Sequence, residues 1–222
     1  MKMRRSIFIL CLLACVGSCS KPGEYAQTVC VAVDVSGTYA DQAAEVTNII
    51  RTGILPSLLP GDSLVVVNID SDSYEKENVV GRLSLDHRPS NANAQKLAFA
   101  DRLDEFANVV AGSQYTDITG AMMMCTDHLR AQDADTKAII IFSDLQEDQP
   151  EGARRAMPPD EFEGLYVAAV NVKQLRDDTE NPLLYRQRLE AWQERVTEGG
   201  AEQWKLIVDP ATLPDYLEST RR

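Results

Sequence analysis

The chain has few of the residues that build zinc centres and nucleophilic active sites. It contains only two histidines, His87 and His128, and neither has a cysteine or second histidine at zinc-ligand spacing. Neither the nucleophile elbow of serine hydrolases nor a phosphate-binding P-loop is present. These absences argue against zinc enzymes, serine hydrolases and P-loop nucleotide hydrolases. Both histidines are therefore predicted to be surface residues.

Basic residues are also scarce. The chain has 22 Lys and Arg against 34 Asp and Glu, a formal net charge of −12. Its first 18 residues contain three basic residues and no acidic ones, so the chain without them carries about −15. Such an acidic surface argues against nucleic acid and anionic lipid as partners.

Long hydrophobic runs are missing, apart from one near the N-terminus. Residues 7–16 are apolar, but a membrane-spanning helix needs about 20 such residues. Basic residues precede this run and Gly17-Ser18 follow it, as in an export signal. Val16-Gly17-Ser18-Cys19 resembles the lipobox of bacterial lipoproteins, which implies a signal peptide over residues 1–18 and a lipid on Cys19.

Two alternatives to this lipobox remain open. One is a plain secretory signal cut near the same place, and the other is cleavage before Cys15, which leaves a shorter apolar core. A lipid on Cys19 would anchor the protein in the bacterial cell envelope. Because Ser20 rather than Asp follows, the resemblance implies the outer membrane if the cell has two membranes.

Apolar runs alternate with helical stripes along the rest of the chain. The pattern predicts one α/β domain over residues 28–222, after a short tether over 19–27. We expect a doubly wound, mostly parallel six-stranded sheet with one antiparallel edge strand and helices on both faces. We expect Pro56 and Pro60-Gly61 to end the first helix. The predicted strands are 28–33, 63–69, 78–85, 137–143, 165–172 and 203–208.

Oxygen-bearing side chains follow the first predicted strand. Asp34, Ser36 and Thr38 are spaced by two where the strand gives way to a loop. Carboxylate and hydroxyl oxygens are the ligands that hard divalent cations select. This strand end is therefore a candidate metal site.

Two later segments place similar chemistry at the same sheet edge. Thr116-Asp117 opens a helical stretch, and Asp144 ends the run from Ala138 to Ser143. Ligands of open α/β sheets bind outside the carboxyl ends of the strands, where these segments are expected to meet. The tether enters the first strand at its opposite end, so the metal edge is predicted to face away from the membrane.

These motifs together resemble the metal-ion-dependent adhesion site of von Willebrand factor type A domains. The resemblance implies Mg²⁺ or Mn²⁺, with Ser36, Thr38 and Thr116 ligating through hydroxyls and Asp34 and Asp144 acting through bound waters. Thr38 stands where the family has Ser, which keeps the hydroxyl. A carboxylate of a protein partner would complete the coordination, because the cation reverses the local charge of an acidic domain.

Asp117 has two compatible interpretations. It is expected to hold the site in shape without ligating the metal, and also to act as a carboxylate at a helix start, where the dipole favours it. The resemblance predicts a non-catalytic binding protein.

Two other functions remain possible. Haloacid dehalogenase-like phosphatases also end their first strand in Asp-x-Asp-x-Thr, but Ser36 replaces the second Asp and cannot act as the general acid. The third interpretation is a structural scaffold with a non-functional metal site.

Only two cysteines follow Cys19. Cys30 lies four residues before Asp34, and Cys125 lies nine residues after Thr116. Strand and helix rises place both about 13 Å below the candidate site, where they could face each other. Buried free thiols are favoured, and a disulfide is the alternative.

Three further segments carry weaker signals. Asp70-Ser71-Asp72-Ser73 is interpreted as a solvated hairpin loop, because it lacks the Gly and Glu of a calcium loop. Residues 146–164 are predicted to form a mobile lip that contacts the partner. Trp192 and Trp204 are predicted to lie in the core.

Overall fold

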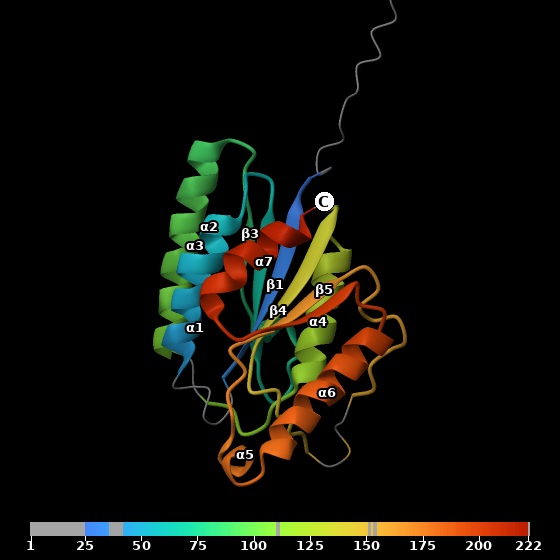
Figure 1. Cartoon of the computed structure of the whole chain (residues 1–222). Coiled ribbons are helices and arrows are strands. Elements are labelled where there is room, and N and C mark those ends of the chain that lie inside the picture. The colour runs from blue at the N-terminus through green and yellow to red at the C-terminus, as the bar shows by residue number, and fades with distance from the viewer. Residues whose placement is uncertain (1–24, 36–41, 110–111, 151, 153–154, 222) are drawn as a thin grey trace, which may run out of the picture.

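A six-stranded sheet forms the centre of the protein, which we describe from a computed structural model covering residues 25–35, 42–109, 112–150, 152 and 155–221 (Figure 1). The strand order is β3-β2-β1-β4-β5-β6, and all neighbours are parallel except β2 and β3. The predicted sheet with one antiparallel edge strand is thus confirmed. The strands are β1 (Gln27–Asp34), β2 (Ser63–Ile69), β3 (Val79–Ser84), β4 (Thr136–Phe142), β5 (Tyr166–Val170) and β6 (Gln203–Ile207).

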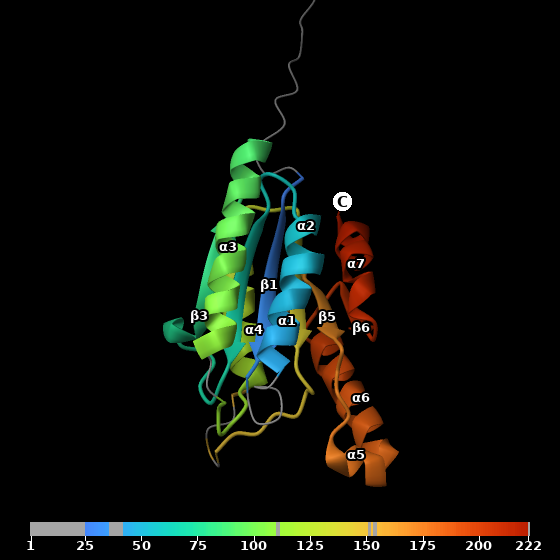
Figure 2. The same cartoon turned by 90° about the vertical axis from the view of Figure 1, so that its left-hand side faces the viewer.

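Helices cover both faces of the sheet (Figures 1 and 2). Successive side chains of β1 point to opposite faces, so Val29, Val31 and Val33 enter one core while Cys30 and Ala32 enter the other. Burial on both sides explains why every residue of β1 is buried and polar alternation is missing. The first core includes α1 (Ala43–Ile49), α3 (Pro89–Val109) and α7 (Leu213–Thr220), and the second includes α4 (Ile118–Arg130) and α6 (Pro182–Glu198).

The first helix does not stop at Pro56. It continues from α1 through a π-helical segment, η2 (Ile50–Ile54), into α2 (Leu55–Ser57). The wider turn is seen where the Leu55 N–H bonds to the Ile50 carbonyl. Proline cannot donate a hydrogen bond and clashes with the preceding α-turn, whereas a π-bulge opens the backbone before it. The helix ends at Ser57, between Pro56 and Pro60-Gly61, the two positions that were expected to end it.

The remaining elements are short. They are η3 (Lys76–Asn78) before β3, α5 (Arg176–Glu180) before α6, and η4 (Pro210–Thr212) before α7. Within the described part of the chain, none of the helices combines the length and apolar character needed to cross a membrane.

A disulfide joins Cys30 of β1 to Cys125 of α4. Both cysteines are fully buried, and their Cα atoms lie 5.5 Å apart, within the range that a disulfide spans. The preference for free thiols was therefore wrong. The two residues were expected to face each other, and they do, so the bond ties together the two elements that carry Asp34 and Thr116-Asp117.

The amino ends of the strands close over a buried polar network that we call the amino-end cluster: Gln27, Asp62, Thr136, Thr220 and Arg221. The Asp62 carboxylate accepts from the Gln27 backbone N–H at 2.8 Å and pairs with the Arg221 guanidinium. The Gln27 side chain donates to the Thr220 hydroxyl at 2.9 Å, and the Thr136 hydroxyl donates to the Thr220 carbonyl at 3.1 Å. This network fixes α7 against the sheet.

Candidate metal site

The ends of β1 and β4 bring two acidic residues side by side. Val33 of β1 pairs with Phe142 of β4, so Asp34 lies beside Ser143 and Asp144 follows at once. The Ser143 hydroxyl donates to Asp34 Oδ2 at 2.6 Å. Asp34 is 0% exposed. Its carboxylate is therefore held at the carboxyl end of β1, and this strand runs toward the lower end of the sheet in Figure 1.

Asp144 sits in a desolvated position. Its side chain is nearly buried, and Oδ1 accepts from the Gln146 backbone N–H at 2.8 Å. Burial raises the pKa of Asp144, while the Gln146 hydrogen bond and the charge of Arg188 oppose that shift. A cation beside this carboxylate would stabilise its charged form, so the position suits a metal ligand.

Thr116 is tied to the same edge by backbone contacts. Its N–H donates to the Asp148 carbonyl at 2.7 Å, and the Asp148 N–H donates back at 3.1 Å. The next residue, Asp117, donates its N–H to the carbonyl of Asp70, which directly follows β2. Since β2 and β4 both neighbour β1, these bonds place the start of α4 next to the ends of three strands.

Asp117 is the N-cap of α4, as expected of a helix-start carboxylate. Its Oδ1 accepts from the Gly120 N–H at 2.8 Å, and its Oδ2 accepts from the Ser73 N–H at 3.1 Å. Arg155 Nε donates to it at 3.0 Å, and the Gln149 amide is a further donor. This buried carboxylate thus joins α4 to the loop after β2 and to the segment after β4.

Gly120 is required by the position of Asp117. A Cβ built on Gly120 would lie 2.1 Å from Asp117 Oδ2, far inside van der Waals contact. Any side chain there must displace the carboxylate from its donors. The sequence analysis missed this requirement, which only the turn geometry of α4 reveals.

The loop after β2 supports the site and is not merely solvated, which corrects the interpretation of Asp70-Ser71-Asp72-Ser73. Ser73 is fully buried, and its hydroxyl accepts from the Asp70 N–H at 2.9 Å. The hydroxyls of Ser71 and Ser113 lie 2.9 Å apart in a hydrogen bond. The two serines of this short loop, Ser71 and Ser73, were the features of the sequence that could have indicated this supporting role.

Glu147 is another residue that the sequence analysis missed. Its Oε1 accepts from the Thr119 N–H, at 2.7 Å, in the first turn of α4. Residues 146–164 were predicted to form a mobile lip, and their first residues instead bond to α4 beside the candidate site. Mobility and partner contact of this segment remain predictions.

The structure thus brings Asp34, Thr116 and Asp144 to one sheet edge, and Asp117, the neighbour of Thr116, caps α4 there. The other predicted ligands, Ser36 and Thr38, lie outside the described residues, as do Cys19 and the signal peptide. In residues 25–35, 42–109, 112–150, 152 and 155–221, no three His, Cys, Asp or Glu side chains are grouped as metal ligands. Two carboxylates and a hydroxyl form an oxygen-only set, which fits a hard cation such as Mg²⁺ or Mn²⁺ and not zinc.

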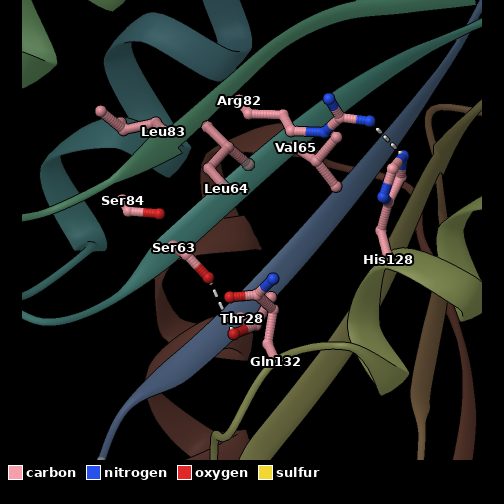
Figure 3. A pocket seen from close by; sticks show the side chains of 9 residues that line it. All are labelled: Thr28, Ser63, Leu64, Val65, Arg82, Leu83, Ser84, His128 and Gln132. Atoms are coloured by element: carbon pink, nitrogen blue, oxygen red, sulfur yellow. Dashed lines mark hydrogen bonds between the residues drawn. The ribbon is translucent and has the colours of Figure 1, made fainter. Parts of the chain in front are cut away.

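A separate pocket lies near the starts of β1 and β2 (Figure 3). The hydroxyls of Thr28 and Ser63 are 2.8 Å apart, and Arg82 Nη2 lies 3.2 Å from His128 Nε2. His128 is half-buried and not a fully exposed surface residue, and burial lowers its pKa. Thr28 precedes Asp34 by six strand residues, or about 20 Å, so this pocket is distinct from the candidate site.

The two predicted core tryptophans differ in burial. Trp192 is buried in the core between α6 and the sheet, as predicted, whereas Trp204 on the edge strand β6 is only half-buried and packs against that core. His87 is exposed, as predicted.

Comparison with known proteins shows similarity at the level of structure. No family model matches the sequence, and none of the curated proteins matches it. An aerotolerance-related membrane protein from Bacteroides fragilis superposes with a TM-score of 0.51 at 11% identity, over 87% of this chain and 97% of that one. BatB from Bacteroides thetaiotaomicron gives a TM-score of 0.50 at 10% identity, over 88% and 98% of the two chains.

A longer protein contains a region of similar fold. The pilus adhesin SpaC from Lactobacillus rhamnosus GG superposes with a TM-score of 0.53 at 15% identity over 90% of this chain. The match spans only 29% of the adhesin. Identities this low establish the fold alone: this chain shares the α/β fold of these proteins, and its strand order agrees with the sheet expected from the resemblance to von Willebrand factor type A domains.

Proposed function

We propose that this protein is a lipid-anchored envelope protein whose von Willebrand factor type A domain binds a protein partner through Mg²⁺ or Mn²⁺. The observation that carries the proposal is the convergence of Asp34, Thr116 and Asp144 at one sheet edge. The Ser143 hydroxyl links the first and last of these strand ends, and the Asp148 backbone links the last to Thr116. The role is binding and not catalysis.

Each residue has a part in this arrangement. The hydroxyls of Ser36, Thr38 and Thr116 would ligate the cation, and Asp34 and Asp144 would hold its bound waters. Asp117 keeps the start of α4 in place through its four donors. The bound cation would supply a positive centre for an acidic side chain of the partner, which an acidic domain otherwise repels.

Three observations support an envelope location. The lipobox-like sequence ends at Cys19. The buried Cys30–Cys125 disulfide is typical of proteins in oxidising compartments. Among structures with this fold are a membrane protein of Bacteroides fragilis and a pilus adhesin.

Partner capture tests the binding role. Tagged wild-type protein and an Asp34→Ala variant are incubated with envelope extract, with Mg²⁺ or with a chelator. We expect a partner that is recovered by the wild type only when Mg²⁺ is present and is lost with the variant. Recovery of the same partner by both proteins, with or without metal, would contradict the proposal.

The anchor is tested separately with the full chain. A Cys19→Ser variant should move from the membrane fraction to the soluble fraction, because its lipid acceptor is gone. Cys15→Ser is the matched control, since it changes the competing cysteine and should leave the protein in the membrane. Release by Cys15→Ser and retention of Cys19→Ser would place the anchor elsewhere.

A further inference from the structure

One face of α6 holds the segment that carries Asp144. Arg188, Trp192 and Arg195 follow the i, i+4, i+7 spacing of a single helix face. Arg188 Nε donates to the Asp144 carbonyl at 2.8 Å, and Trp192 Nε1 donates to the Leu145 carbonyl at 2.9 Å. Three side chains of one helix thus contact consecutive parts of one loop.

The third contact extends this hold to the start of α4. Arg195 Nη1 lies 3.2 Å from Glu147 Oε2 and donates at 3.2 Å to the Thr119 hydroxyl. Its guanidinium lies over the Trp192 ring, 4.4 Å from the centroid. The contacts of Trp192 and Arg195 are therefore formed by side chains that also pack against each other.

Arg188 is itself fixed by a buried ion pair. Its guanidinium donates to both carboxylate oxygens of Asp178, at 3.2 Å and 2.7 Å. Asp178 is 2% exposed, and its Oδ2 also accepts from the Leu175 N–H at the start of α5. A bidentate pair of this kind locks the guanidinium, so Nε is aimed at the Asp144 carbonyl.

The loop adopts a backbone conformation that needs such support. Leu145 has φ of +63°, in the left-handed region, and its side chain is buried. A non-glycine residue stays in that region only when its surroundings determine it. Its N–H donates to Ser143 Oγ at 2.9 Å, while Ser143 donates to Asp34, so the turn also sets the geometry between the two acidic residues.

We infer that Arg188 is a positioning residue for metal binding: anchored by Asp178, it fixes the Asp144 backbone and so aims the Asp144 carboxylate at the sheet edge. Arg188 lies 44 residues from Asp144 in the sequence, and its hydrogen bond reaches the Asp144 backbone carbonyl and not the carboxylate. The inference rests on the proposed function, because it assigns the support of the same site.

The test uses the purified full chain and two kinds of variant. Arg188→Met removes the contact but leaves the buried Asp178 without its partner, which can unfold the protein. The double variant Asp178→Asn/Arg188→Met avoids that cost, since the Asn oxygen still accepts from Leu175. Arg186→Met, an exposed change of the same type on the same helix, is the matched control for the loss of an arginine.

Two readouts separate positioning from general stability. In chelator, hydrogen exchange of the Leu145 and Gln146 amides reports the turn, because these amides bond to Ser143 and to the Asp144 carboxylate. We expect exchange about tenfold faster in the folded double variant than in the control. Calorimetric titration with Mn²⁺ should show affinity at least about tenfold weaker, as for other residues that support metal ligands.

Exchange at the control rate in the folded double variant would overturn the inference, as would faster exchange with unchanged Mn²⁺ affinity. The hydrogen-exchange measurement needs no metal. If the wild type binds no Mn²⁺, the proposed function fails, while the exchange result still decides whether Arg188 holds the turn.

Discussion

Two buried aspartates, Asp62 at the amino end of the sheet and Asp144 at the carboxyl end, have different surroundings. At the amino end, Asp62 is surrounded by donors: the backbone N–H groups of Gln27 and Leu59, and the guanidinium of Arg221. At the carboxyl end, Asp144 accepts one described backbone N–H, and burial raises its pKa. The Asp62 carboxylate has donors for both oxygens within the fold, whereas burial disfavours the ionised form of Asp144.

This difference separates structure from function within one domain. Asp62 follows the rule that a buried carboxylate finds its hydrogen-bond donors within the fold, because each of its oxygens has donors. A protein departs from such rules mainly at functional sites, where a ligand completes the interactions. We therefore expect removal of the charge of Asp62 and removal of the charge of Asp144 to change stability in opposite directions.

The largest effect is expected for removal of the Cys30–Cys125 disulfide, which lies along the sheet between its amino and carboxyl ends. Cys30→Ala/Cys125→Ala removes a bond between residues 95 apart, and loop-closure entropy predicts a loss of about 4–5 kcal/mol in the free energy of unfolding. Urea unfolding of wild type and variant measures it. A loss below about 1 kcal/mol would show that the bond adds little to either end.

Asp62→Asn should be the next most severe change. It leaves the half-buried Arg221 guanidinium, whose side chain is 17% exposed, without its charged partner, and breaking a buried pair costs at most about 3–5 kcal/mol. Asp133→Ala, at an exposed aspartate, is the control and should stay within about 0.5 kcal/mol of wild type. Equal stability of Asp62→Asn and this control would remove the contrast between the two ends.

Gly120→Ala tests the support beneath the candidate site. The new methyl group must push the Asp117 carboxylate away from its donors, and overpacking of this kind costs about 1–3 kcal/mol. Gly53→Ala is the matched control, because the nearest atom to its Cβ is 4.0 Å away. We expect that control to gain up to about 1 kcal/mol in thermal unfolding, and a similar gain for Gly120→Ala would contradict the assigned role of Asp117.

The smallest effect, with the opposite sign, is expected for Asp144→Asn in chelator. A carboxylate whose pKa is raised by folding contributes stability below its unfolded pKa, and that contribution is lost as the pH rises through the folded value. At neutral pH the Asn variant should therefore equal or slightly exceed wild type, since its side chain still accepts from Gln146. The gap should close toward about pH 4. A marked loss of stability in urea unfolding would show that the charged form is already satisfied by the fold.

Much of the architecture could be predicted from the sequence. Strands buried on both faces are continuous apolar runs, and Asp34 and Asp144 stand out because each directly follows such a run. Parallel strands place those ends at one edge, so the meeting of the two residues follows from topology. Each of these features lies within a short stretch of the sequence, so the sequence alone is enough to predict it.

Contacts between distant segments could not be predicted in the same way. Arg188 and Arg195 look like solvent-facing charges of an amphipathic helix, yet both contact the segment after β4. The Cys30–Cys125 bond depends on how closely α4 packs on β1, which spacing alone leaves open. The π-helical segment before Pro56 arises from backbone geometry that periodicity does not encode.

The most direct test of the central claim is calorimetric titration of Mn²⁺ into the purified full chain and its Asp34→Ala variant. The convergence of Asp34, Thr116 and Asp144 predicts one saturable site in the wild type and none in the variant. Absence of binding in the wild type, or equal binding by the variant, would contradict the assignment of this sheet edge as a metal site.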